Sequence, residues 1–361
     1  MALLLGGCIT PLELPEVRPE AGLREDWMTP RTPDGESLTS IAGLADDARL
    51  VALVELALES NPDLVQTAYR LRESGALLGE VAARRWPAGE LAVSQSRGRQ
   101  ADGGSSASST TSLGLDISWE VDVWGRLADQ VREADSRHRA LEADYLAASN
   151  SLAARTLQTA LRRISLSRQL EIEATRVASL EATLEIVRER FRIGLGAITD
   201  WDASQSELAT TQATVEGLHE SVRQTDRDLA VLLGDLNLEP QEDLSRLPDM
   251  AVLEISLPRV SLPAEVLAAR PDVAAARQRL LASGAAVSAA RKALLPSFTL
   301  SGNFTQAGPG LDEALKADPV WSLLGNLAAP LFNRKALLSE HEASRYRQHE
   351  AAWAYRAVLL A

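Results

Sequence analysis

The sequence predicts a mainly α fold with a membrane β-barrel portion, made of long antiparallel helical hairpins and four β-strands and internally duplicated. Three observations support this prediction. Residues 112–121 alternate strictly in polarity, residues 126–193 contain neither Gly nor Pro, and one pattern recurs at a displacement of 209 positions. Strand hairpins joined to helices of this length do not fit an ordinary globular core.

Composition restricts the class of protein. The chain has 361 residues, of which 45% are hydrophobic and 24% are charged, and this balance is typical of a chain that buries a core. The formal net charge of -13 argues against a nucleic-acid partner, because binding phosphates requires clustered Lys and Arg. No run of 18 apolar residues occurs in the sequence, so we expect any membrane crossing to use strands.

The N-terminal segment resembles a bacterial lipoprotein signal. In residues 1–8, the expected signal remnant with its lipobox, a short apolar run ends in two small residues and the single cysteine. We therefore predict lipid (palmitate) attachment at Cys8. No Lys or Arg precedes Cys8, so the basic start of a secretory signal is missing. Residues 9–61 are expected to form a proline-rich N-terminal arm and a short helix from about 45 to 58.

A first structural repeat is expected over residues 62–234, and it begins with a capped helix. Asn61 is placed as the N-cap, Pro62 at the first helical position and Asp63 near the positive end of the helix dipole. We expect this helix to continue to about residue 85, because Pro87 cannot extend it.

A strand hairpin is expected next, with a weaker strand over 91–97, a polar loop over 98–111 and the alternating stretch 112–121. About 9 to 11 residues of tilted strand cross a bilayer, so we expect the apolar face to contact lipid and the polar face to line a lumen. A half-buried strand of a soluble sandwich has the same local pattern. The residues expected to face the membrane, in this strand and its counterpart further along the chain, are Leu113, Leu115, Ile117, Trp119, Phe298, Leu300 and Phe304.

The segment 126–193 is predicted to be one helix, on the order of 100 Å long, that pairs with the helix after it. Apolar residues step by three and four in both segments, as in a coiled coil. The two sets are Val177, Leu180, Leu184, Val187 and Phe191, and Leu208, Thr211, Val215, Leu218, Val222, Thr225, Leu229 and Leu232. In the turn over 194–202, Gly194 and Gly196 permit a sharp reversal and Asp200 is expected to cap the returning helix.

Residues 235–262 are expected to be a linker, and residues 263–361 a second repeat. The recurring pairs are Pro62-Asp63 as Pro271-Asp272, Arg70-Leu71 as Arg279-Leu280, Ser74-Gly75 as Ser283-Gly284, and Pro87 as Pro296. A second strand hairpin is expected from 298, with a loop over 307–319 and a return strand from 321. A further helix begins near Lys335 and the sequence stops at Ala361, so we expect a repeat truncated by about 100 residues before its helical hairpin is complete.

Four strands cannot close a membrane barrel, because the smallest barrels need about eight. Open strand edges are not tolerated in lipid, so several chains must combine their strands. Two chains would supply eight strands and three chains twelve.

Several segments resemble outer-membrane efflux proteins of the TolC-like class, and most closely the NodT-type outer-membrane lipoproteins of tripartite efflux systems. The similar segments are 118–126 (Ser-Trp-Glu-Val-Asp-Val-Trp-Gly-Arg), 190–195 (Arg-Phe-Arg-Ile-Gly-Leu) with Asp200, 267–273 (Leu-Ala-Ala-Arg-Pro-Asp-Val), 295–298 (Leu-Pro-Ser-Phe), and 330–332 (Pro-Leu-Phe) after Trp321. The resemblance extends from about Leu53 to Ala361.

The resemblance implies a homotrimer in outer-membrane lipid, with a twelve-stranded barrel continuous with a periplasmic α-barrel and a lipid anchor. The implied function is a passive exit duct for drugs or other small molecules, with a periplasmic adaptor (membrane fusion) protein and an inner-membrane pump as partners. The implied periplasmic tip and adaptor contact consists of Arg190, Gly194, Leu195, Thr199, Asp200 and Asp202. A ring of Asp200 or Asp202 would favour cations at a constriction, and helix capping or solvation explains these carboxylates equally well.

Two alternatives stay open, an exit duct for type I protein secretion and a soluble periplasmic coiled-coil adaptor. We expect no enzymatic activity, no cofactor and no metal. The four histidines are scattered along the chain, and the sequence contains no nucleophile elbow, phosphate loop or Cys cluster.

Overall fold

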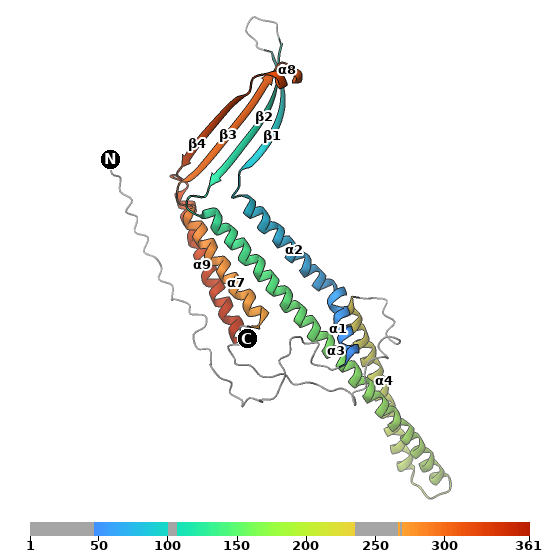
Figure 1. The fold of residues 1–361 in the computed structure, drawn as a ribbon. Helices are drawn as coiled ribbons and strands as arrows, with labels where there is room; N and C mark the ends of the chain where they lie inside the picture. The colour runs from blue at the N-terminus through green and yellow to red at the C-terminus, as the bar shows by residue number, and fades with distance from the viewer. Residues whose placement is uncertain (1–46, 100–106, 235–265, 268) are drawn as a thin grey trace. The chain divides into compact units, whose positions relative to one another are not determined.

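A computed structural model describes residues 47–99, 107–234, 266–267 and 269–361 (Figure 1). The predictions for Cys8, for residues 9–46 and for the linker over 235–262 lie outside the described residues. The chain divides into two compact units, which are described separately. Unit 1 includes residues 71–143 and 267–361, and unit 2 includes residues 47–70 and 144–234.

Within the described residues, the elements have the order that the sequence predicts, with one helix added. In chain order they are α1 (Ala48–Ser60), α2 (Pro62–Ala83), β1 (Ala88–Arg99), β2 (Ala107–Val121), α3 (Arg126–Arg192), α4 (Ile198–Leu233), α7 (Pro271–Lys292), β3 (Ser297–Gly308), α8 (Leu311–Lys316), β4 (Val320–Ala328) and α9 (Arg334–Leu360). The series α2-β1-β2-α3 is followed later by the similar series α7-β3-β4-α9. No helix of the described residues is long and apolar enough to span a bilayer.

Unit 1 contains a four-stranded antiparallel sheet in the order β1-β2-β3-β4 (Figure 1). The alternating stretch 112–121 lies in β2, as predicted, and β2 begins five residues earlier, at Ala107. The expected polar loop over 98–111 is therefore too long. Its Ser and Thr residues continue the pairing with β1, as in Thr111 opposite Gln95, because a β-branched side chain fits a pleated strand well.

The loop expected over 307–319 contains the short helix α8, so this prediction was wrong. Acidic residues occupy its first turn, where they favour the helix dipole. Lys316 at its end lies 2.5 Å from Asp312, and Ala314 is fully buried. These local contacts stabilise a turn of helix that hydrophobic periodicity over six residues does not reveal.

In the same unit, α7 and α9 pack side by side through small and aromatic residues (Figure 1). Val273 and Ala276 of α7 form a buried cluster with Tyr355 and Leu359 of α9. Alanine permits close approach of the helix backbones, and the larger side chains of α9 fill the remaining space.

Unit 2 is a helical bundle whose core lies among α1, α3 and α4. Leu50 and Val54 of α1 are buried against Leu157 of α3 and Leu229 of α4. The helix α1 begins after Asp47, whose carboxylate accepts a hydrogen bond from the Arg49 amide at 2.8 Å.

A buried ion pair in unit 2 crosses from α3 to α4. Arg163 Nε lies 2.6 Å from Asp226 Oδ1, and both side chains are mostly excluded from water. The pair therefore fixes the two helices of the hairpin to each other at one level of the bundle.

The start of α2 confirms the predicted cap. The Asn61 carboxamide oxygen accepts hydrogen bonds from the amides of Asp63 (3.0 Å) and Leu64 (3.1 Å). Its amide nitrogen donates to the carbonyl oxygen of Leu232 at 3.0 Å. At the end of α4, Gly234 adopts φ +68, and a Cβ there would lie 2.4 Å from the Ser60 carbonyl oxygen. The end of α4 is thus fixed to the link between α1 and α2.

The predicted seam between α3 and α4 is confirmed. On α3, Val177 and Leu180 are half-buried while the residues between them are exposed, and on α4 Thr211, Thr225 and Leu229 are buried. The spacings between these positions are three residues, four residues or whole heptads, so one stripe of each helix faces the other.

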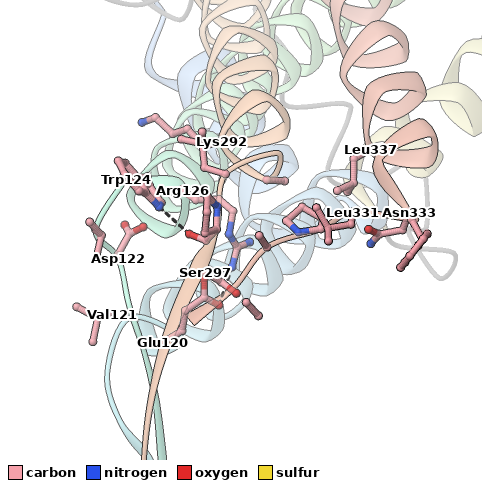
Figure 2. A pocket seen from close by; sticks show the side chains of 18 residues that line it. Glu120, Val121, Asp122, Trp124, Arg126, Lys292, Ser297, Leu331, Asn333 and Leu337 are labelled. Atoms are coloured by element: carbon pink, nitrogen blue, oxygen red, sulfur yellow. Dashed lines mark hydrogen bonds and ion pairs between the residues drawn. The ribbon is translucent and has the colours of Figure 1, made fainter. Parts of the chain in front are cut away.

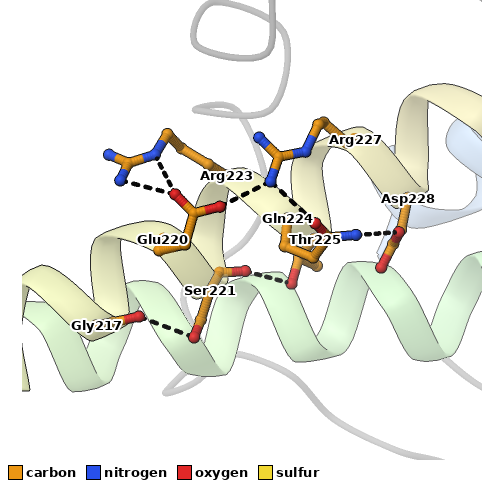
Figure 3. A network of polar contacts seen from close by, with 8 residues as sticks. All are labelled: Gly217, Glu220, Ser221, Arg223, Gln224, Thr225, Arg227 and Asp228. Carbon is orange, nitrogen blue, oxygen red and sulfur yellow. Dashed lines mark hydrogen bonds and ion pairs between the residues drawn. The ribbon is translucent and has the colours of Figure 1, made fainter.

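The outer face of α4 is polar, with a network in which Glu220 binds Arg223 and Arg227 (Figure 3). Hydrogen bonds from Arg227 and then Arg223 lower the pKa of Glu220. These contacts join residues on successive turns of α4. They stabilise the helix on the side that has no apolar partner among the described residues.

Candidate functional site

The sheet of unit 1 has one apolar and one polar face. The predicted membrane-facing residues share the apolar face, with Leu115 opposite Phe304 and Trp119 opposite Leu300. Phe304 also lies directly opposite Trp321 of β4, which is 73% exposed. Apolar side chains that remain exposed over a whole sheet face require a non-aqueous neighbour.

The polar face carries a row of side chains that crosses all four strands. Glu90 lies opposite Asp116, Asp116 opposite Asn303, and Asn303 opposite Ser322. The Asn303 amide donates to Asp116 Oδ1 at 2.7 Å. The two faces therefore have the opposite polarities that a barrel wall between lipid and a wet lumen requires.

Where the strands pass into helices, two indole groups make hydrogen bonds to backbone carbonyls. Trp119 Nε1 donates to the Arg85 carbonyl oxygen at 2.9 Å, and Trp124 Nε1 donates to the Pro296 carbonyl oxygen at 2.7 Å. Each bond joins segments that are distant in sequence, so the two residues fix the sheet to the helix ends.

The residues between these tryptophans start α3. Both carboxylate oxygens of Glu120 accept from Arg126 at 2.7 Å. The Asp122 carboxylate accepts from the free amides of Leu127 and Ala128, at 3.1 and 2.8 Å. The charged residues of the segment 118–126 thus satisfy the helix N-terminus.

A buried carboxylate joins α3 to α7 just beyond this junction. The side chain of Asp129 is 1% exposed and lies 2.6 Å from Lys292 Nζ. Ser288 Oγ donates to it at 2.5 Å, and Arg132 also pairs with it. Burial acts to raise the pKa of Asp129, but the hydrogen bonds of Lys292 and Ser288 and the charges of Lys292 and Arg132 outweigh it, so the pKa is lowered.

Sequence reasoning missed this cluster. Asp129 and Lys292 are far apart in the sequence, and each looks like an ordinary polar residue of an exposed helix face. No local pattern in the sequence indicates the contact. In the structure, Gly125 adopts φ +73 beside the cluster, and its carbonyl oxygen accepts from Lys292 at 3.2 Å.

A surface hollow of about 750 Å³ opens beside the junction (Figure 2). Trp124, Arg126 and Lys292 lie on one side of it, and Leu331 and Leu337 on the other. The side with Leu331 and Leu337 is apolar, and Leu331 is 73% exposed.

The turn between α3 and α4 holds the predicted tip residues. Gly194 adopts φ +76, as the predicted reversal requires, and the Leu195 amide donates to the Arg190 carbonyl oxygen at 2.8 Å. Leu195 is 77% exposed. Thr199 and Asp202 lie in the first turns of α4 and are exposed.

Two details of the tip prediction were wrong. The N-cap of α4 is Ala197, without a side-chain cap, so Asp200 lies in the first turn and does not cap the helix. Its charge still lies near the positive helix end. Gly196 has no positive φ. A Cβ there would make a tight contact, 3.2 Å from the Phe191 amide nitrogen, and the turn lies beside the Phe191–Trp201 ring pair.

One histidine makes a contact that resembles part of a catalytic triad. His138 Nδ1 lies 2.7 Å from Ser74 Oγ, and its Nε2 lies 3.5 Å from Glu142. Ser74 Oγ donates its proton to the Leu71 carbonyl oxygen at 2.7 Å, so the hydroxyl accepts from the histidine. A nucleophilic serine requires the reverse direction. Among the described residues, no group of three or more His, Cys, Asp or Glu side chains is placed to hold a metal ion.

The faces of the sheet and the paired helices define a class of protein, a channel component whose strands meet lipid on one side. The family model for "Outer membrane efflux protein" matches residues 53–235 and 262–361. The chain belongs to this family of outer-membrane proteins.

Named relatives and solved structures agree with this assignment. The chain is 30% identical over 379 residues to the pyoverdine export outer membrane protein OpmQ of Pseudomonas putida, an alignment that covers 100% of this chain and 78% of the relative. It is 23% identical over 314 residues to the cation efflux system protein CusC of Escherichia coli K12, covering 86% and 67%. The structure of the outer-membrane channel OprN superimposes with a TM-score of 0.82 at 26% identity, covering 94% of this chain and 78% of that one.

Proposed function

We propose that the chain is the outer-membrane exit duct of a tripartite efflux system, working as a homotrimer that passes small molecules passively. The observation that carries this proposal is the sheet of the described residues, which has four strands, outer edges at β1 and β4, and opposite polarities on its faces. Every residue of β4 is exposed. An edge strand in lipid leaves backbone groups without hydrogen bonds, so neighbouring copies must pair with it.

The tip between α3 and α4 is the proposed contact with a periplasmic adaptor protein, through which an inner-membrane pump is connected. Leu195, Ile193 and Ile198 are 77%, 54% and 47% exposed around one turn. Apolar side chains grouped at a helical tip fit a hydrophobic groove between the helices of a partner. The predicted tip residues Arg190 and Asp202 would supply a charged rim.

Relatives suggest the class of cargo. They are described as proteins of pyoverdine export, cation efflux and toluene efflux. These are small molecules or ions, which favours small-molecule export over protein secretion for this chain. Lipid attachment at Cys8, the division into repeats over 62–234 and 263–361, and the absence of enzymatic activity are further parts of this proposal.

Deletion and complementation in the native host test this function. Cells lacking the protein should accumulate a fluorescent efflux substrate, and the protein should remain in carbonate-washed outer membranes. A Leu195→Asp variant should lower efflux without lowering its amount in the outer membrane, whereas Ile172→Asp, at a residue 57% exposed on α3, should not. Release of the protein by carbonate, or full efflux with Leu195→Asp, would contradict the proposed duct or its tip contact respectively.

A further inference from the structure

The short helix α8 of unit 1 lies at the end of the sheet that is farthest along the strands from α2 and α3 (Figure 1). At this end, Thr111 of β2 lies opposite Gly308 of β3. Thr111 is two residues from Leu113 on the same strand, so Thr111, Gly308 and Leu113 share one face of the sheet. This is the apolar face, on which the predicted membrane-facing residues lie.

The helix packs directly on this apolar face. A Cβ built on Gly308 would lie 2.6 Å from the Ala314 amide nitrogen, so the glycine allows the backbone of α8 to contact the strand. The Gln306 side chain, on the same face, donates a hydrogen bond to the Ala317 carbonyl oxygen at 2.8 Å. Ala314 is fully buried, and Thr111 is only 5% exposed. The helix therefore lies on the outside of the sheet and not over the polar face.

The position of α8 across the sheet is central. It contacts β2 and β3, which are the two inner strands. In the proposed homotrimer, neighbouring copies pair through the outer strands β1 and β4, so α8 lies away from the edges at which copies meet. The surface around it is the outer face of the barrel wall, and the helix adjoins the lipid that this face contacts.

The apolar rows of this face end at the level of α8. The strand from Leu113 to Val121 covers about 27 Å. At a tilt of about 35–45°, it spans roughly 20 Å of height, close to the apolar band of about 25 Å on the outside of membrane barrels. The next rows on the same face carry Thr111 opposite Gln95 and then Arg97, which is exposed. The helix therefore lies at the level where hydrocarbon gives way to polar lipid groups.

The side chains of α8 separate into an apolar and a charged side. Leu311 and Leu315 lie one turn apart, and they are 54% and 55% exposed. Asp312 and Lys316, each about 100° further round the helix, are also exposed and pair with each other. A six-residue helix that leaves both of its leucines uncovered within the described residues has an amphipathic surface suited to a membrane interface.

We propose that α8 is a membrane-surface helix whose Leu311 and Leu315 enter the outer leaflet beside the barrel wall. The inference rests on the proposed function, in which the apolar face of the sheet contacts lipid and the long helices extend into the periplasm. Arg97, on the same face and near the same level, fits the phosphate groups of that leaflet. The helix fixes the height of the barrel in the bilayer, because a shift either way would place the leucines in water or the Asp312–Lys316 pair in hydrocarbon.

Spin labels test this placement in the full chain, reconstituted in vesicles of phosphatidylethanolamine and phosphatidylglycerol. A nitroxide is attached to Leu315→Cys, and Lys316→Cys, at the next residue of the same helix, is the matched control. Collisions of the nitroxide with oxygen, which dissolves in lipid, are compared with its collisions with a water-soluble nickel chelate. The ratio of oxygen to nickel collisions should be severalfold higher for Leu315→Cys. Leu311→Cys and Asp312→Cys form a second pair that should differ in the same direction.

Two references complete the experiment. Leu323→Cys, at a residue 66% exposed on the apolar face of β4, gives the ratio for a side chain in lipid, and the unsubstituted chain measures any labelling of Cys8. Equal ratios for Leu315→Cys and Lys316→Cys, or few collisions with either reagent at Leu315→Cys, overturn the inference, since they place the leucine in water or against protein. The proposed function stands if Leu323→Cys still favours oxygen, and both fail if it favours nickel.

Discussion

Removing Lys292 should destabilise unit 1 more than removing both members of its ion pair. In Lys292→Ala, the Asp129 carboxylate keeps Ser288 and the mostly exposed Arg132, but it loses the ammonium group 2.6 Å away while remaining 1% exposed. Breaking a buried pair from one side costs roughly 3–5 kcal/mol. The remaining partners favour the lower end, so we expect a loss of about 3 kcal/mol in the free energy of unfolding.

The double variant Asp129→Leu with Lys292→Ala replaces both members of the pair by apolar residues. Replacing a buried ion pair by apolar residues is often neutral, so we expect a loss of no more than about 1 kcal/mol. Urea unfolding in mild detergent, followed by circular dichroism in the far ultraviolet, gives both values. A double variant less stable than Lys292→Ala alone would refute the reasoning.

The same pair makes stability depend on pH at the acid end. The pKa of Asp129 is lowered in the folded state, so its contribution is present above the ordinary value of 3.8 and is lost as the pH falls below 3.8 through the folded-state pKa. The stability difference between the wild type and the double variant should therefore stay constant from about pH 7 to about pH 5 and shift against the wild type at lower pH. A shift centred above about pH 5 would contradict this sign.

Three further predictions concern single residues and the same unfolding measurement. Asn61→Ala should lower the free energy of unfolding by about 2 kcal/mol, because it removes a helix cap and a buried hydrogen-bond donor. Asn61→Asp should recover part of this loss, because aspartate can also cap the helix. Equal losses in the two variants would contradict a capping role. Gly217→Ala should raise the free energy of unfolding by about 0.5–1 kcal/mol, because Gly217 lies in an open helix interior. Gly194→Ala should lower it by about 1 kcal/mol, because Gly194 has a φ of +76, and a gain at Gly194 would refute the strain argument. Trp119→Phe should cost about 1 kcal/mol by losing the bond to the Arg85 carbonyl oxygen, and no loss would show that this bond is unimportant.

Long periodic patterns made much of the fold predictable. The helix expected over 126–193 is α3, Arg126–Arg192, because no Gly or Pro interrupts it. The seam with α4 followed from the spacing of apolar residues, and the cap at Asn61 from its position before Pro62. Each of these features depends on residues close together in the sequence.

Features that leave no periodic pattern in the sequence were not predictable. Nothing near Asp129 or Lys292 in the sequence indicates that they meet, and the short helix α8 is supported by contacts within six residues rather than by a pattern. Asp200 was placed as a cap because its type suits one, while the turn closed earlier than expected around Gly196. The residue types therefore predicted a turn followed by a helix, but not the residue at which α4 begins.

The end of α4 has a consequence for altering the protein. Gly234 must be glycine for two independent reasons, a left-handed backbone and the nearness of the Ser60 carbonyl oxygen. The main chain therefore leaves α4 at one obligatory point, and we expect sequence inserted immediately before residue 234 to disrupt it.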